Sequence, residues 1–162
     1  MERAVFFDVA NQTYGIDVED TQAIEKKVSI LPIPNTVPYI VGLIKLRGEI
    51  IPVYSLRKKF GMPPKASSSG DEQYIIANLD QNMHLALEVD GIREIVEINT
   101  GDTSVPPALI KTDGTGYISQ VASVKNQLAV MISVQGLLSE EEKNNLKEFL
   151  REKAKESDNQ EN

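Results

Sequence analysis

Apolar and polar residues alternate along much of this chain, with the two-residue period of strands that bury one face. Residues 5–9 and 14–18 show this alternation on either side of residues 10–13, which predicts a hairpin near the N-terminus. The polar stretch at residues 19–25, which contains Ile24, fits a single helical turn. The sequence therefore begins with a β-hairpin followed by a short connector.

The densest apolar block spans residues 39–56 and is divided by Arg47-Gly48. Because glycine accepts a positive φ at low cost, this pair predicts a tight turn between two strands. The Ser- and Gly-containing residues 65–71 predict a loop. Further strands are predicted at residues 74–79 and 85–89, and a final alternating strand at residues 128–134.

A helix is predicted at residues 140–154. Ser139 and Glu142 have the spacing of a capping box, in which each side chain accepts from the other residue's amide. Leu146, Phe149 and Leu150 form one apolar face that would dock on the strands. The following residues, 155–162, contain nothing to bury, so we expect a disordered tail there.

The chain contains an internal repeat. Residues 39–56 match residues 117–134 at a constant shift of 78, with Arg47-Gly48 on Lys125-Asn126. Residues 18–24 match 89–95 at a shift of 71, and Val9 falls on Leu79 at a shift of 70. Alternating sequences match one another to some degree by chance, but short strands in two such sets favour two small β-barrels that leave few exposed edges.

The repeat also sets the expected domain boundaries. We expect one domain over residues 1–154, all-β apart from its C-terminal helix, with barrels over roughly 14–65 and 72–135. The N-terminal strand is a candidate for exchange between the two halves.

Composition and charge exclude several classes of protein. The core must consist mainly of Val, Ile and Leu, since only 6% of residues are aromatic. There is no Cys, which excludes disulfides and thiolate chemistry. The net charge of −7 disfavours binding to nucleic acid. Because no apolar run approaches the roughly 20 residues of a membrane span or resembles a signal peptide, we expect a soluble, cytoplasmic protein without direct membrane insertion.

Candidate catalytic groups each have a simpler explanation. Asp8 and Asp17 alternate with apolar neighbours, as solvent-facing residues do, and residues 140–142 are acids that complement a helix dipole. His84 is the only histidine, so no multi-histidine metal site is available. Gly114 and Gly116 lack the Lys and the helix of a phosphate loop. A small β-barrel enzyme acting through carboxylates is the remaining alternative, and hydrolase activity or nucleotide or metal binding would favour it.

Residues 38–61 carry the most distinctive motif. Gly42, then Leu46-Arg47-Gly48, a branched pair, Pro52 and Leu56 resemble the signature of the CheW family. The opening hairpin and the segment Glu88-Val89-Asp90-Gly91-Ile92 resemble the same family, so that the similarity covers about residues 4 to 150. Leu-Arg-Gly alone is a weak signal, but the whole set in this order and spacing is specific.

The resemblance implies two SH3-like five-stranded barrels and a role without catalysis or cofactors. Proteins of this family join the cytoplasmic tips of chemoreceptors (methyl-accepting chemotaxis proteins) to the regulatory domain of the CheA histidine kinase. The resemblance thus implies recruitment to membrane-associated receptor arrays. CheV-like proteins and CheA share the domain, but they would need further domains that 162 residues do not accommodate.

The same resemblance implies a set of binding residues. A groove for receptor helices would be lined by Val5, Val18, Thr21 and Ile24. For the three aliphatic residues, the alternative is plain barrel core. Arg47 would take part in coupling, with a solvated turn charge as the alternative. Gly42 and Gly48 would provide a close backbone approach and a turn.

Two residues depart from the family pattern. Ser55 replaces an Asp that is frequent before the motif Leu, and a small polar residue can still cap the strand end. Ala23 replaces a frequent Glu that could pair with Arg47. Glu25 or Glu49 would have to supply that partner.

Overall fold

The computed structural model describes residues 2–26, 28–33, 37–64, 72–105 and 116–160, with side chains up to residue 155. The loop expected at residues 65–71 and the Gly114 turn lie outside this part of the chain.

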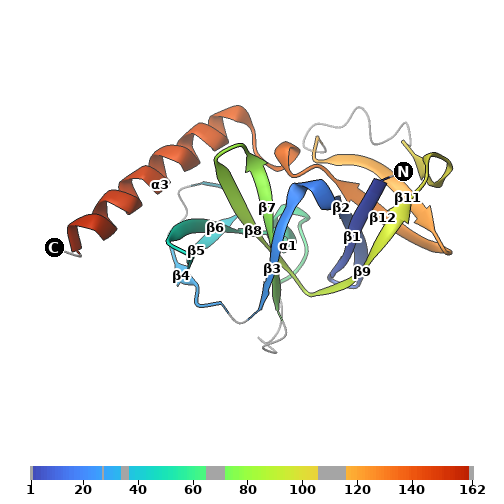
Figure 1. The fold of residues 1–162 in the computed structure, drawn as a ribbon, viewed down its shortest axis with the longest axis horizontal. Helices are drawn as coiled ribbons and strands as arrows, with labels where there is room; N and C mark the ends of the chain where they lie inside the picture. Colours follow the sequence, from blue (N-terminus) through green and yellow to red (C-terminus); the bar gives the residue numbers. More distant parts are fainter. Residues whose placement is uncertain (1, 27, 34–36, 65–71, 106–115, 161–162) are drawn as a thin grey trace.

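Two sheets lie side by side along the long axis, and one helix extends outward beside the second sheet (Figure 1). The first sheet has the order β10 (Thr103–Ser104), β11 (Ile118–Val124), β12 (Gln127–Ile132), β2 (Gln12–Asp17), β1 (Glu2–Val9) and β9 (Gly91–Ile98). The second has the order β3 (Thr21–Lys26), β7 (Gln73–Asp80), β8 (Met83–Val89), β6 (Glu49–Ser55), β5 (Ile40–Leu46) and β4 (Leu31–Pro32).

The internal duplication is visible in this topology. When β1 to β6 are matched in order with β7 to β12, the two sheets have the same strand order. Each contains a single parallel pair at the same place, β12 with β2 and β6 with β8. Met131 faces Gly15 in one pair and Val53 faces Ala86 in the other, which are equivalent positions of the repeat. The predicted fold class is therefore confirmed, with a sixth, two-residue strand in each sheet.

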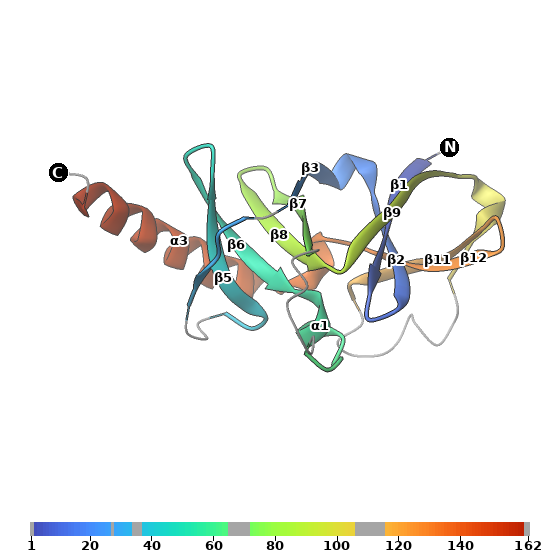
Figure 2. The ribbon, with the colours of Figure 1, turned by 90° about the horizontal axis from the view of Figure 1, so that it is seen from below.

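The division of the chain between the sheets differs from the boundaries expected at 14–65 and 72–135. The first sheet combines the hairpin β1–β2 with β9 to β12, and the second combines β3 to β6 with the hairpin β7–β8. A whole hairpin is thus exchanged between the repeats, in both directions, rather than one N-terminal strand (Figure 2). Strands of two similar repeats have the same alternation, so the pattern alone does not say which sheet each one joins.

The connector expected after the first hairpin is also different. The segment at residues 19–25 contains a 3-10 turn, η1 (Val18–Asp20), but β3 follows at once and pairs with β7. The equivalent segment after Val89 is the strand β9, which pairs with β1. Both strands lie at sheet edges. Half-buried and exposed positions alternate in β3, whose only large aliphatic residue is Ile24, so the sequence of this strand resembles that of a connector.

The buried residues form three clusters. One lies on the first sheet and contains Ala4, Phe6, Val96, Ile98, Ala122, Ala129 and Met131. A second lies on the second sheet and contains Ile44, Ile51, Val53, Tyr74, Ile76 and Ala86. The repeat relates them, since a shift of 78 residues places Ile44 on Ala122, Ile51 on Ala129 and Val53 on Met131. The largest cluster takes side chains from both sheets, including Phe7, Ile16, Tyr54 and Leu87, and joins the two halves into one body.

Three hairpin turns have two consecutive residues with positive φ, as type I′ turns require. They are Ala10-Asn11 (φ 50° and 67°), Arg47-Gly48 (50° and 82°) and Lys125-Asn126 (51° and 63°). The last two are equivalent in the repeat, and the tight turn predicted at Arg47-Gly48 is confirmed.

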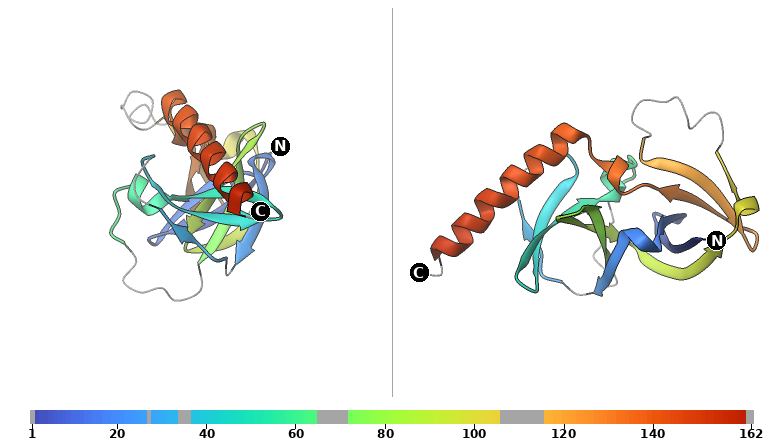
Figure 3. Two further views of the ribbon diagram at one scale, coloured as in Figure 1. Left: turned by 90° about the vertical axis from the view of Figure 1, so that its left-hand side faces the viewer. Right: turned by 45° about the horizontal axis from the view of Figure 1, so that its top comes forward.

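The remaining elements follow the strands. A short helix α1 (Leu56–Lys59) succeeds β6, the 3-10 turn η2 (Thr100–Asp102) succeeds β9, and η3 (Gln135–Leu137) succeeds β12. Helix α3 (Glu140–Gln160) closes the chain and reaches beyond the second sheet (Figure 3). The predicted capping box is confirmed, since the Ser139 amide donates to Glu142 Oε1 at 2.9 Å and the Glu142 amide donates to Ser139 Oγ at 3.1 Å.

The C-terminal helix is longer than expected, because it runs to Gln160 rather than to residue 154. Leu146 is fully buried and Leu150 packs on the central cluster, as the apolar face predicted. The extension, residues 155–160, continues the helix although it contains no apolar residue to bury.

Candidate functional site

The chain passes between the two sheets at two equivalent places. At the first crossover, residues 17–21, it leaves β2 and enters β3 through η1. At the second crossover, residues 89–91, it leaves β8 and enters β9. Three of the candidate groove residues, Val18, Thr21 and Ile24, lie at or just after the first crossover. The first crossover and the adjacent strand β3 therefore form the candidate docking surface.

The candidate groove residues differ in exposure. Val5 is only 2% exposed and belongs to the central core, as the alternative interpretation expected. Val18 is half-buried and packs against that same core. Thr21 is half-buried, and its hydroxyl donates to the Asp17 carbonyl at 3.3 Å. Ile24 is 40% exposed, so it presents apolar surface to solvent.

Arg47 lies beside this surface. Its side chain is 83% exposed at the β5–β6 turn, and Nη2 lies 3.9 Å from Glu25 Oε1 on β3. The other candidate partner, Glu49, instead contacts His84, with 2.7 Å between Oε2 and Nδ1. Of the two acids considered as replacements for the missing partner at Ala23, Glu25 is thus the one that pairs with Arg47.

Ala23 leaves room beside the arginine. A cavity of about 140 Å³ is lined by Ala23, Arg47, Leu46, Ile76 and other side chains of β3 and the β5–β6 hairpin. A longer acidic side chain at residue 23 would enter this space. The weak Arg47–Glu25 contact leaves the guanidinium available for carboxylates or carbonyls of a partner.

The two candidate glycines have structural roles rather than contacts at the docking surface. A Cβ on Gly42 would clash with Ile30 Cγ2 and lie 2.9 Å from the Leu31 carbonyl oxygen, so only glycine allows β4 to approach β5 this closely. Gly48 has φ 82° in the β5–β6 turn. Both geometries are those expected from the sequence.

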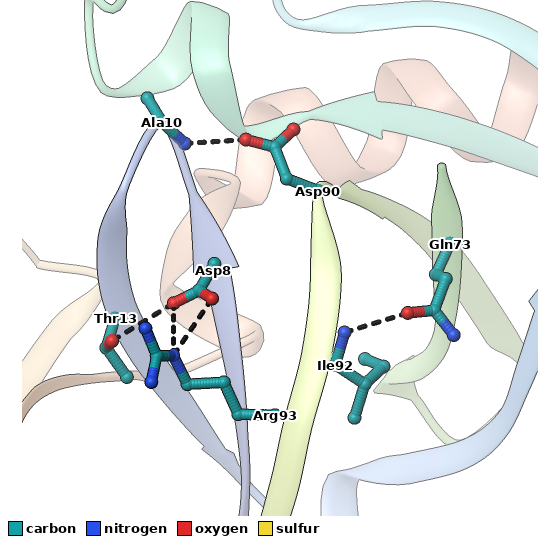
Figure 4. Close-up of polar contacts among 7 residues, drawn as sticks. All are labelled: Asp8, Ala10, Thr13, Gln73, Asp90, Ile92 and Arg93. Carbon is teal, nitrogen blue, oxygen red and sulfur yellow. Dashed lines mark hydrogen bonds and ion pairs between the residues drawn. The ribbon is translucent and has the colours of Figure 1, made fainter. Parts of the chain in front are cut away.

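The second crossover contains polar residues that sequence reasoning did not select. The Asp90 carboxylate accepts from Arg57 Nη2 at 2.6 Å and from the Ala10 amide at 2.7 Å. Figure 4 shows Asp90 against the β1–β2 turn, with the Ile92 amide donating to Gln73 Oε1 at 2.8 Å nearby. Asp90 belongs to the Val-Asp-Gly segment and Arg57 follows the repeated block, so both lay within the motifs but had no assigned role.

Ser55 keeps a capping role at the end of β6. It is buried, and its hydroxyl accepts from the Lys58 amide at 3.3 Å at the start of α1. The departure from the more frequent Asp therefore leaves the cap in place, as expected.

Burial shifts the pKa of several titratable groups. Burial raises the pKa of Tyr54 well above its usual range and that of Tyr74 to about 12, so both stay protonated at neutral pH. The Tyr54 hydroxyl donates to the Leu137 carbonyl at 3.2 Å. Burial also raises the pKa of Asp20 at the first crossover, although the hydrogen bond from Gln135 opposes this shift. Among the residues that the structure describes, no three His, Asp or Glu side chains lie together as a metal site.

These features define a class: a two-barrel β protein with duplicated halves whose exposed residues are suited to binding other proteins. The CheW-like domain family matches residues 3–142. The chain belongs to the CheW family of chemotaxis scaffold proteins.

Individual relatives of known sequence or structure support membership of this family. Chemotaxis protein CheW of Treponema pallidum (strain Nichols) is 30% identical over 141 residues, which cover 85% of this chain and 82% of that protein. Chemotaxis protein CheW of Bacillus subtilis (strain 168) is 28% identical over 140 residues, covering 86% and 88%. The crystal structure of the scaffolding protein TtCheW from Thermoanaerobacter tengcongensis superimposes with a TM-score of 0.74 at 32% identity, covering 84% of this chain and 91% of that one.

None of the described helices combines the length with the apolar content needed to cross a membrane.

Proposed function

We propose that this protein is a non-catalytic adaptor that couples the cytoplasmic tips of chemoreceptors to the regulatory domain of the CheA histidine kinase. It would act in the cytoplasm and be recruited to receptor arrays at the membrane. The observation that carries the proposal is the exposed surface at β3, where Ile24 lies on the strand whose Glu25 contacts Arg47. Apolar side chains beside a cation are suited to a helix that carries carboxylates.

The receptor tip is the partner assigned to this surface. A helical hairpin presents apolar side chains at positions i, i+3 and i+4, and Val18, Thr21 and Ile24 would receive them. Val5 lies in the core beneath, where it supports the surface through packing.

The test reverses the charge at Arg47. Arg47→Glu should reduce capture of receptor or kinase fragments in a pull-down while circular dichroism shows an unchanged fold. The repeat offers a matched control, Lys125→Glu, at the equivalent turn position with nearly the same φ (51° against 50°). Capture of both partners that is unchanged by Arg47→Glu would remove Arg47 from the proposed surface.

A further inference from the structure

A cavity opens beside the β5–β6 turn, on the face of the second sheet that carries the second buried cluster. We call this cavity the anchor pocket. Its volume is about 140 Å³, and its apolar lining comes from Ala23, Leu46, Ile51 and Ile76. Ile51 and Ile76 are each only 3% exposed and belong to the second cluster. The anchor pocket is therefore an extension of the barrel interior toward solvent.

The small side chain of Ala23 leaves this space open. Ala23 on β3 faces Ile76 on β7, so the two side chains point to the same face of the sheet. A single methyl group covers little of the surface of Ile76. The repeat places Glu94 at the equivalent position of β9, because residues 18–24 correspond to residues 89–95. The first sheet thus has a longer side chain where the second sheet has Ala23.

Two pairs of polar groups lie at the rim of the anchor pocket. Arg47 Nη2 lies 3.9 Å from Glu25 Oε1, and Glu49 Oε2 lies 2.7 Å from His84 Nδ1. Both acids of the rim therefore already have a partner. An apolar centre with a polar rim is the arrangement that excludes water around the anchoring side chains of protein–protein interfaces.

The charges at the rim determine which kind of side chain fits. A carboxylate inside the pocket would meet Glu25 and Glu49 beside a single guanidinium, and like charges repel. A partner carboxylate is better placed on the solvent side of Arg47, whose side chain is 83% exposed. A cation inside the pocket would lose its hydration against an aliphatic floor. An uncharged apolar side chain gains from burial and disturbs neither rim pair.

The volume of the anchor pocket matches one side chain. An apolar cavity of about 150 Å³ accepts a molecule as large as benzene. The anchor pocket, at about 140 Å³, therefore has room for the side chain of one Leu, Ile, Met or Phe.

We propose that the anchor pocket receives one apolar side chain of the receptor tip. The pocket shares Arg47 and Glu25 with the candidate docking surface. Ile24 lies on the other face of β3, which is an edge strand, so a helix along this edge reaches both Ile24 and the pocket. Ala23 is then a specificity-determining residue, because its size leaves space for the anchor. The choice of occupant rests on the proposed function, whereas the apolar pocket itself does not.

Substitutions at residue 23 fill the anchor pocket from within. Ala23→Leu adds branched carbons that pack on Ile51 and Ile76, so the variant should fold and be at least as stable as the original protein. Ala23→Met fills the same space with a more flexible side chain and serves as a second filling variant. Ala23→Ser leaves the volume nearly unchanged and is the matched control. Circular dichroism confirms that each variant is folded before it is compared.

Isobutanol, which has the carbon skeleton of a leucine side chain, probes the pocket without any partner. In methyl NMR spectra, the signals of Ile51 and Ile76 should shift as isobutanol is added to the original protein and to Ala23→Ser. The same signals should stay in place in Ala23→Leu and Ala23→Met. Ile16, which is buried in the central cluster, provides the reference signal. Equal shifts of all three isoleucines, or no shift in the original protein, would overturn the pocket.

A receptor-tip helical hairpin tests the occupant. Ala23→Leu should weaken its binding about tenfold or more, because the anchor can no longer be buried, whereas Ala23→Ser should bind like the original protein. Alanine substitutions along the hairpin should identify one apolar residue whose loss weakens binding to the original protein but not to Ala23→Leu.

Three results would contradict the assignment, each at a different step. Equal affinities of the original protein and Ala23→Leu for the hairpin would refute the occupant, although isobutanol shifts would still establish the pocket. Weakened binding of the kinase regulatory domain alone would overturn the assignment to the receptor. Absence of hairpin binding to the original protein would refute the proposed receptor surface.

Discussion

Tyr39 and Tyr117 are equivalent residues of the internal repeat, and Lys59 lies between their rings. Lys59 Nζ is 5.1 Å from the centroid of each ring. Tyr39 precedes a strand of the second sheet and Tyr117 a strand of the first, so one ammonium group on α1 contacts both halves of the molecule. This contact joins the barrels at a site that neither repeat could form alone.

Loss of this cation should weaken the junction. Lys59→Met retains most of the apolar stem but removes the charge, and we expect it to lower the free energy of unfolding by about 1 kcal/mol. Urea denaturation measures the change. Lys58→Met is the matched control, because the Lys58 side chain is exposed on the same short helix. Equal stability of the two variants would show that the ring contacts contribute nothing.

Glycine and alanine substitutions should rank in opposite order of stability at Tyr39 and at Tyr117. Tyr39 has φ 69°, a conformation that costs a side chain about 1 kcal/mol, whereas Tyr117 is not among the described residues with positive φ. Tyr39→Gly should therefore be more stable than Tyr39→Ala, by roughly 1 kcal/mol. At Tyr117 the order should reverse. Thermal or urea unfolding measures the stability of the four variants. If the glycine and alanine variants rank in the same order at both positions, the backbone of Tyr39 is not strained.

Gly42 should not tolerate a methyl group. The Leu31 carbonyl oxygen would lie 2.9 Å from a Cβ there, so Gly42→Ala must displace β4 from β5 and should cost about 2 kcal/mol. The control is Gly91→Ala at the second crossover, where the nearest atom to a Cβ is Gln73 Oε1 at 3.8 Å. That variant should be nearly neutral in urea unfolding. A neutral Gly42→Ala would mean that β4 packs more loosely than described.

Asp20 should make stability depend on pH. Burial raises the pKa of this carboxyl in the folded protein, so the folded state binds the proton more tightly than the unfolded chain does. Burial of the ionised carboxylate lowers the stability of the folded protein. This loss is absent below the ordinary aspartate pKa and is complete once the pH exceeds the raised pKa of the folded state. Asp20→Asn should consequently be more stable than the original at pH 7, and the difference should disappear near pH 3.

Unfolding midpoints of the two proteins between pH 3 and pH 7 provide the measurement for Asp20. A difference that is independent of pH would show that the carboxyl is not penalised by burial.

Much of the local structure could be predicted from the sequence. The turn at Arg47-Gly48, the capping box at Ser139 and Glu142, and the repeat each depend on short-range chemistry that residue types make visible. The matching of Arg47-Gly48 with Lys125-Asn126 even anticipated two hairpins with the same backbone conformation.

The pairing of distant strands could not be predicted in the same way. β3 pairs with β7 through residues that are 47 (Lys26 and Gln73) to 56 (Thr21 and Ala77) positions apart, and the pattern of residues in β3 is equally compatible with pairing to β1. The sequence therefore predicts the exchange of one strand, whereas the two halves of the structure exchange a whole hairpin.

The candidate site was predicted unevenly for a similar reason. Ile24 and Arg47 lie on the surface, but Val5 faces the core, because the periodicity of a strand shows two faces without showing which one meets solvent. Asp90 and Arg57 escaped selection because their contact joins residues 33 positions apart in sequence. The repeat continues one residue past Leu56, where the shift of 78 places Arg57 on Gln135.

The central claim is that one molecule binds a receptor tip and the kinase regulatory domain at the same time. Sedimentation velocity of the full chain with a receptor-tip helical hairpin and the regulatory domain of CheA, separately and together, tests it most directly. The adaptor account predicts a complex that contains all three proteins and that is weakened by Arg47→Glu but not by Lys125→Glu. Mutual displacement of the two partners, or failure to bind either of them, would contradict it.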